Sequence, residues 1–178
     1  QGYKTTFSQT IPIVQDSSSF KNTFGVSAYH DFSEDLIGSM KFLVKSINGV
    51  DDDVRLTNRL YVPQSRLRGF NTYQVGPKDG DDYIGGNYLT TVNAEAQLPN
   101  LLPETYRTDI SVFLDTANIW GVDYNDSIDE TDKIRAAVGV SANIFTTVGP
   151  LSFTIAQDIT KHASDTTETF NFRLGTSF

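Results

Sequence analysis

The chain has 178 residues, enough for one ordinary domain with a sizeable core, and 38% of them are hydrophobic. Its 14 basic and 22 acidic residues give a formal charge of −8, which argues against nucleic acid as a partner. The absence of cysteine excludes disulfides, thiolate metal sites and a cysteine nucleophile. No stretch approaches the roughly 20 apolar residues that a transmembrane helix needs.

Nine segments in which apolar and polar residues alternate follow one another along the chain. A period of two, repeated this often, predicts β-strands rather than helices. In chain order, the segments are 3–14, 20–32, 36–46, 54–62, 87–98, 106–115, 134–144, 151–159 and 170–178. The predicted fold class is therefore all-β and antiparallel.

Two architectures fit this pattern. A soluble sandwich or lipocalin-like barrel would turn the apolar face inward, whereas an outer-membrane barrel would turn it toward lipid. Soluble strands usually run about 5–6 residues, and most of these segments are longer. Short turns at 99–104 and 147–150 alternate with long polar loops at 63–85, 118–132 and 160–168, which is typical of membrane barrels. The pattern favours a transmembrane β-barrel.

Acidic residues concentrate in three stretches between the strands, at 51–53, 79–82 and 123–132. A calcium site in one of them is an alternative interpretation. However, the stretch from Asp123 lacks the central glycine and the closing glutamate of an EF-hand loop. We interpret all three as solvated loops.

The polar segment 64–87 contains Leu67-Arg68-Gly69-Phe70. Connections in compact domains are usually about 4–6 residues, so a loop of this length is expected to be functional or disordered. The sequence Leu67-Arg68-Gly69-Phe70 resembles the (V/I)RG(F/Y) motif in the long sixth extracellular loop of the BamA superfamily, which assembles outer-membrane β-barrels.

Four further segments resemble motifs of this superfamily, and they occur in the family's order. Residues 85–87 resemble its GGN, 113–120 its FxDxGxxW strand, 149–153 its GPLxF, and 170–178 its FxFxxGxxF ending. The departures are Leu67 at the usual valine or isoleucine and Ala117 at the usual glycine. The first sixty residues match only as generic strands.

The resemblance implies a sixteen-stranded barrel preceded by periplasmic POTRA domains. Nine strands correspond to slightly more than half of such a barrel. We therefore expect residues 1–178 to be the C-terminal portion of the barrel domain, with the POTRA domains and the N-terminal strands outside this chain. The alternative is a small barrel that closes on itself, since bacterial single-chain barrels have even strand numbers.

The resemblance also implies a site inside the barrel. In the family the loop arginine folds into the lumen and pairs with the aspartate of the FxDxG strand, which here means Arg68 with Asp115. The alternation places Glu95 on the corresponding polar face of the neighbouring strand, so Glu95 is expected to share the arginine. Gly69 would allow a tight turn and Phe70 would pack against the wall. The alternative is that Arg68 is a solvated loop residue.

The last strand, with Phe170, Phe172, Leu174 and Phe178 on one face, has two interpretations. It is either a general C-terminal closure signal or, as the resemblance implies, one side of a lateral gate to which a client strand adds by main-chain hydrogen bonds.

The predicted function is assembly: folding and inserting β-barrel proteins into the bacterial outer membrane, without nucleotide, metal or cofactor. The expected partners are the lipid bilayer, nascent outer-membrane proteins and, through the absent POTRA domains, the assembly lipoproteins. The alternatives are a TamA-like factor, a two-partner secretion transporter, or a passive pore. No GxSxG elbow, metal-spaced histidine pair or nucleophile–base set is recognisable, so we do not expect an enzyme.

Overall fold

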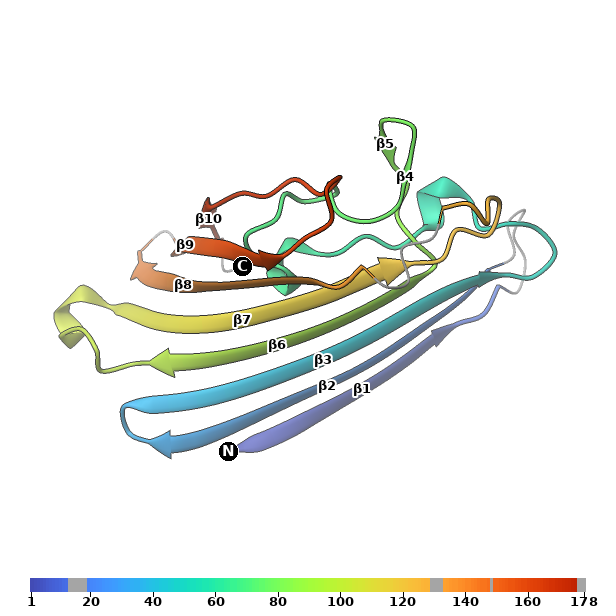
Figure 1. Cartoon of the computed structure of the whole chain (residues 1–178). Helices are drawn as coiled ribbons and strands as arrows, with labels where there is room; N and C mark the ends of the chain where they lie inside the picture. Colours follow the sequence, from blue (N-terminus) through green and yellow to red (C-terminus); the bar gives the residue numbers. More distant parts are fainter. Residues whose placement is uncertain (13–18, 129–132, 148, 176–178) are drawn as a thin grey trace.

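The computed structural model describes residues 1–12, 19–128, 133–147 and 149–175. Eight strands form one antiparallel sheet, in the order β1-β2-β3-β6-β7-β8-β9-β10 (Figure 1). Their bounds are β1 Gly2–Thr10, β2 Ser19–Ser33, β3 Leu36–Gly49, β6 Tyr88–Leu98, β7 Thr108–Trp120, β8 Arg135–Thr146, β9 Gly149–Thr160 and β10 Phe170–Leu174. A two-stranded hairpin, β4 Lys78–Asp79 with β5 Asp82–Tyr83, lies apart from this sheet. The predicted all-β, antiparallel fold class is confirmed.

The two faces of the sheet differ in the way the alternation predicts. On β7, Val112 and Leu114 are each 43% exposed, whereas Phe113 and Asp115, which alternate with them, are buried. The exposed set on the same outer face extends across the sheet and includes Met40, Val138, Val140, Ile155, Phe170 and Phe172. An apolar face that no described residue covers, opposite a polar face on which the long loop lies, is the arrangement of a membrane-barrel wall.

The sheet does not close within the described residues. β1 forms one edge and β10 the other, and each is hydrogen-bonded to one neighbour only (Figure 1). Open edges do not face lipid in membrane barrels, because their unpaired main-chain groups find no partner there. The sheet is therefore one part of a larger wall.

One predicted strand is wrong. Residues 54–62 form a 3-10 helix at Leu56–Asn58 and irregular chain, with an isolated bridge between Leu60 and Gly86. Val54 and Val62 are buried, but neither belongs to a strand of the main sheet, and Val62 packs against the inner face of that sheet. The sheet consequently has eight strands rather than nine, and a single connection, residues 50–87, joins its third and fourth strands. We call residues 50–87 the long loop.

Correcting that strand makes the alternation of connections regular. The β2–β3 and β6–β7 connections lie at one end of the sheet, and the long loop and residues 161–169 lie at the other. The helices of the described residues are 3-10 turns, Leu56–Asn58, Gln64–Arg66 and Glu104–Tyr106, and none of them is long and apolar enough to cross a membrane.

Candidate functional site

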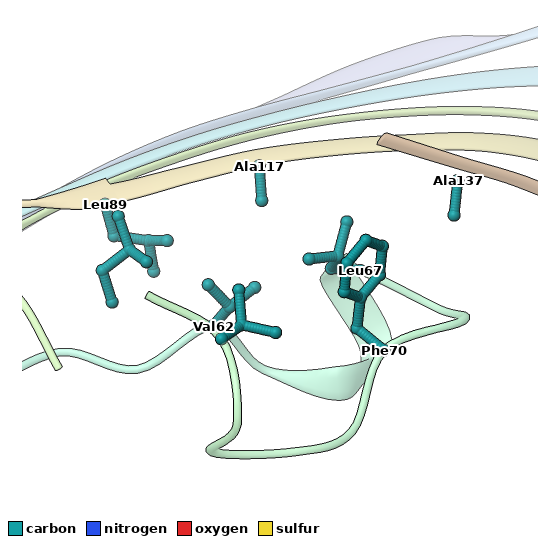
Figure 2. Packing of buried hydrophobic residues seen from close by; sticks show 8 residues of the cluster. Val62, Leu67, Phe70, Leu89, Ala117 and Ala137 are labelled. Atoms are coloured by element: carbon teal, nitrogen blue, oxygen red, sulfur yellow. The ribbon is translucent and has the colours of Figure 1, made fainter. Parts of the chain in front are cut away.

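The long loop folds back onto the inner face of the sheet. Figure 2 shows Leu67 and Phe70 at the loop tip facing Ala117 and Ala137 of the strands. The buried cluster consists of Val62, Leu67, Phe70 and Val75 from the loop with Leu89, Ala117, Ile119 and Ala137 from the sheet. Removing side chains the size of Leu67 and Phe70 from water contributes about 1.5–3 kcal/mol each, so this contact is a substantial anchor.

Small residues on β8 and β9 make room for the tip. Gly69 has a φ of +88°, and a Cβ there would lie 2.9 Å from the Ala156 Cβ and 3.3 Å from the Ala137 Cβ. Only glycine satisfies both the backbone conformation and the close approach. We call Leu67, Arg68, Gly69 and Phe70 the tip of the long loop. Close packing against β8 and β9 positions the tip independently of its charged contacts.

Arg68 is bound by the two carboxylates that were predicted as its partners. Its Nε donates to Asp115 Oδ2 at 2.7 Å and its Nη2 donates to Asp115 Oδ1 at 2.9 Å, a bidentate pair. Its Nη1 donates to Glu95 Oε2 at 2.9 Å, and its main-chain N–H also donates to Asp115 at 3.1 Å. The structure thus brings together Arg68 from the loop, Glu95 from β6 and Asp115 from β7.

Two further residues complete this cluster. Phe113 lies under the guanidinium of Arg68, 3.5 Å from Cζ to the ring centroid, which explains an aromatic residue on the polar face of β7. Asn93 on β6 donates to both Asp115 Oδ1 and the Arg66 carbonyl. Burial lowers the pKa of Arg68, but the bonds to Asp115 and Glu95 raise the pKa by more, so the guanidinium keeps its charge.

A second ion pair, which the sequence did not single out, lies closer to the outer loops. Arg135 at the start of β8 donates from Nε and Nη2 to the two oxygens of Asp165, at 2.9 and 3.1 Å, and both side chains are completely buried. Asp165 also accepts the main-chain N–H groups of Gly76 and His162. The alternation had placed Arg135 on the polar face, but no sequence signal marks Asp165 within its loop.

A third pair secures the outer part of the long loop. Arg59, with a side chain only 1% exposed, donates to Asp123 Oδ1 at 2.5 Å, and Val54 N–H donates to Oδ2 at 2.6 Å. Partial burial raises the pKa of Asp123, but the bonds from Val54 and Asn87 and the charge of Arg59 lower the pKa further, to below its ordinary value.

The predicted residues of the last strand lie away from this cluster. Phe170, Phe172 and Leu174 are exposed on the outer face and pair with Ile155, Phe153 and Leu151 of β9. Phe178 lies outside the described residues. Residues 129–132 of the third acidic stretch also lie outside them, and in the part that is described no three histidine or acidic side chains are grouped to hold a metal ion.

A curved antiparallel sheet with an apolar outer face, and with a loop held on its polar inner face, defines part of the wall of an outer-membrane β-barrel. The sequence model of the Omp85 superfamily domain matches residues 1–178, so the chain belongs to the Omp85 superfamily. The predicted family resemblance is confirmed, and with it a location in the bacterial outer membrane.

Two curated relatives are named outer membrane protein assembly factor BamA. The protein from Neorickettsia risticii is 27% identical over 128 residues, covering 70% of this chain and 17% of the relative. The protein from Neisseria meningitidis serogroup B is 27% identical over 139 residues, covering 63% of this chain and 17% of the relative. The chain therefore spans about a sixth of the length of these curated relatives.

The same fold occurs in the crystal structure of BamA from Haemophilus ducreyi lacking POTRA domains 1–3. The TM-score is 0.88 at 24% identity, with 99% of this chain and 38% of that chain covered. This agreement in fold extends over nearly all of the present sheet and its loops.

Proposed function

We propose that residues 1–178 are the C-terminal part of the barrel domain of an outer membrane protein assembly factor, which folds other β-barrel proteins and inserts them into the outer membrane. The observation that carries this proposal is the loop tip bound to Asp115 and Glu95 inside a sheet of the Omp85 superfamily. The names of the curated relatives support the same activity.

The arrangement suits an activity that involves no catalysis. A client strand has an unpaired main-chain edge to add to, and strand addition needs hydrogen bonds and not a reactive group. In this proposal β10 contributes that edge, and Phe170, Phe172 and Leu174 keep its outer face in contact with lipid. The inserted long loop fills the space behind the edge with a fixed polar surface.

The partners follow from the same proposal. The apolar outer face contacts the lipid bilayer, and nascent outer-membrane proteins are the clients. The remaining barrel strands and the POTRA domains precede this portion in the complete protein, and the POTRA domains bind the assembly lipoproteins.

The experiment is client folding into liposomes that contain the complete gene product. We expect insertion of an unfolded barrel client, followed by its heat-modifiable gel mobility, to be faster than in empty liposomes. Asp115→Asn removes the charge that holds Arg68, so it should slow insertion. Asp109→Asn makes the same chemical change on the same strand, six residues from Asp115, and serves as the matched control.

A passive pore would behave differently in the same liposomes. Steady ion conductance without any acceleration of client folding would refute the assembly proposal. Equal slowing by Asp115→Asn and Asp109→Asn would show that the Arg68 cluster has no particular part in it.

A further inference from the structure

The last strand is paired over only part of its length. β9 runs to Thr160, but only its residues 151–155 pair with β10. Leu151 lies opposite Leu174 at one end of this pairing, and Ile155 lies opposite Phe170 at the other. One more bond continues it, from the Ala156 N–H to the Thr169 carbonyl at 2.9 Å. The chain bends at Thr169, so the residues before Thr169 do not continue β10 in a straight line. We call residues 165–169 the lead-in segment.

The lead-in segment is bonded to the tip of the long loop instead. The Glu168 N–H donates to the Gly69 carbonyl at 2.9 Å, and the Asn71 N–H donates to the Thr166 carbonyl at 2.9 Å. Between these bonds, Phe70 and Thr167 form an antiparallel bridge. The loop tip thus acts as a short strand against the lead-in segment, and Figure 1 shows the two segments leaving the plane of the main sheet.

The main-chain groups of the lead-in segment bond partly to β9 and partly to the loop tip. In an antiparallel ladder, successive residues bond to opposite sides. Thr169 bonds to β9, whereas Glu168 and Thr166 bond to the tip, which lies on the inner face of the sheet beside Ala137 and Ala156. The main-chain groups that would continue the free edge of β10, if the segment were straight, are therefore occupied by the tip.

Side chains hold the lead-in segment in the same place. Asp165 is fixed by Arg135 and by the Gly76 N–H of the long loop. The Glu168 carboxylate accepts from Gln64 at 3.3 Å and from Asn171 at 2.9 Å. If the segment instead continued β10 in the register already present, Thr166 would face Ile159, and Glu168 would turn to the outer face with Phe170. A carboxylate there is unfavourable, which favours the bent form while the loop is seated.

We propose that the loop tip is an internal blocking strand, which occupies the main-chain groups of residues 166–168 and keeps the lead-in segment bent away from β9. Withdrawal of the tip allows residues 165–169 to extend β10 along β9 and exposes a longer edge to an incoming strand. This inference goes beyond the proposed function, because the two positions of the segment can be measured without any client protein.

The test uses two cysteine pairs that share one member. Asn71→Cys with Thr166→Cys captures the bent form, since these residues lie opposite each other beside the Phe70–Thr167 bridge. Ile159→Cys with Thr166→Cys captures the extended form. The 178 residues contain no cysteine, so each pair reports one contact. The complete gene product is expressed in the outer membrane of a Gram-negative host, and disulfide yield is measured by mass spectrometry on the folded, heat-modifiable gel band.

With the loop seated, we expect the 71–166 disulfide to form in most molecules and the 159–166 disulfide in few. Two changes then release the tip. Asp115→Asn weakens its charge anchor, and Gly69→Val gives it a side chain that collides with Ala156. Either should raise the 159–166 yield about tenfold and lower the 71–166 yield. Asp109→Asn should change neither yield.

Three outcomes would overturn the proposal. The first is failure of the 71–166 disulfide to form with the native loop. The second is a 159–166 yield that stays at its starting level in both release variants. The third is an equal rise in Asp109→Asn, which would show that the extension does not depend on the loop.

Discussion

Two buried arginine–aspartate pairs each join a loop to the inner face of the sheet, but the arginine belongs to the loop in one pair and to the sheet in the other. Arg68 reaches from the long loop to carboxylates on β6 and β7, whereas Arg135 reaches from β8 to Asp165 in the lead-in segment. The Arg68 side chain is 16% exposed and binds two carboxylates, whereas the side chains of Arg135 and Asp165 are completely buried. Loss of a carboxylate should therefore cost less in the first cluster, where a second carboxylate and water remain, than in the completely buried second site.

The largest effect is expected from Asp165→Ala. It removes the carboxylate that Arg135 binds through Nε and Nη2 in a site where both side chains are completely buried, and breaking such a pair typically costs about 3–5 kcal/mol. The measurement is the free energy of unfolding by urea in a bilayer. Asp158→Ala is the matched control, since the ion pair of Asp158 with Lys161 is partly exposed, and a loss below about 1 kcal/mol is expected there. Similar losses in both variants would contradict the distinction between the two sites.

A smaller effect is expected from Asp115→Asn. Glu95 remains beside Arg68 and water reaches the guanidinium, so we expect a cost of about 2 kcal/mol. The effect should appear locally, as faster protease cleavage of the long loop. A loop as resistant as in the unchanged protein would show that Asp115 does not hold the tip.

Glu95→Gln should cost less again, about 1 kcal/mol, because the pair is partly solvated and Asp115 keeps both of its bonds to Arg68. The same cleavage assay measures it. In the double variant with Asp115→Asn, the loss should exceed the sum of the two single losses, since each carboxylate compensates for the other. Strict additivity would mean that they act independently.

The smallest effect concerns pH at the outer end of the long loop. The pKa of Asp123 is lowered in the folded protein, so its stabilising contribution is fully present above the ordinary value of 3.8 and is lost as the pH falls through the lower, folded value. Fluorescence of Trp120, the single tryptophan of the 178 residues, follows this change. We expect a transition with its midpoint below pH 3.8 that is missing in Asp123→Asn, and a midpoint above that value would contradict the assignment.

The strands of the second half were predictable because they are long and one face of each meets lipid. On β7, for example, Val112 and Leu114 alternate with Ser111, Phe113 and Asp115, and the structure keeps that division. The segment 54–62 has the same alternation and was predicted wrongly. Val62 of this segment is buried against the inner face of the sheet without joining it, and a period of two does not distinguish that burial from the burial of a strand.

The sequence by itself determined the fold class and the superfamily, because alternation and short motifs are local properties of the chain. The contact of Arg68 with Asp115 was an expectation that the family resemblance implied, and alternation added Glu95 to it. Only the tertiary structure decided that Asp165 is the partner of Arg135 and that the loop tip pairs with residues 166–168. The Arg135–Asp165 pair joins two side chains, and no sequence motif marks Asp165 within its loop. The pairing of the loop tip uses main-chain groups, which carry no residue-specific signal. Only the folded structure therefore shows that the long loop binds the residues immediately before the last strand.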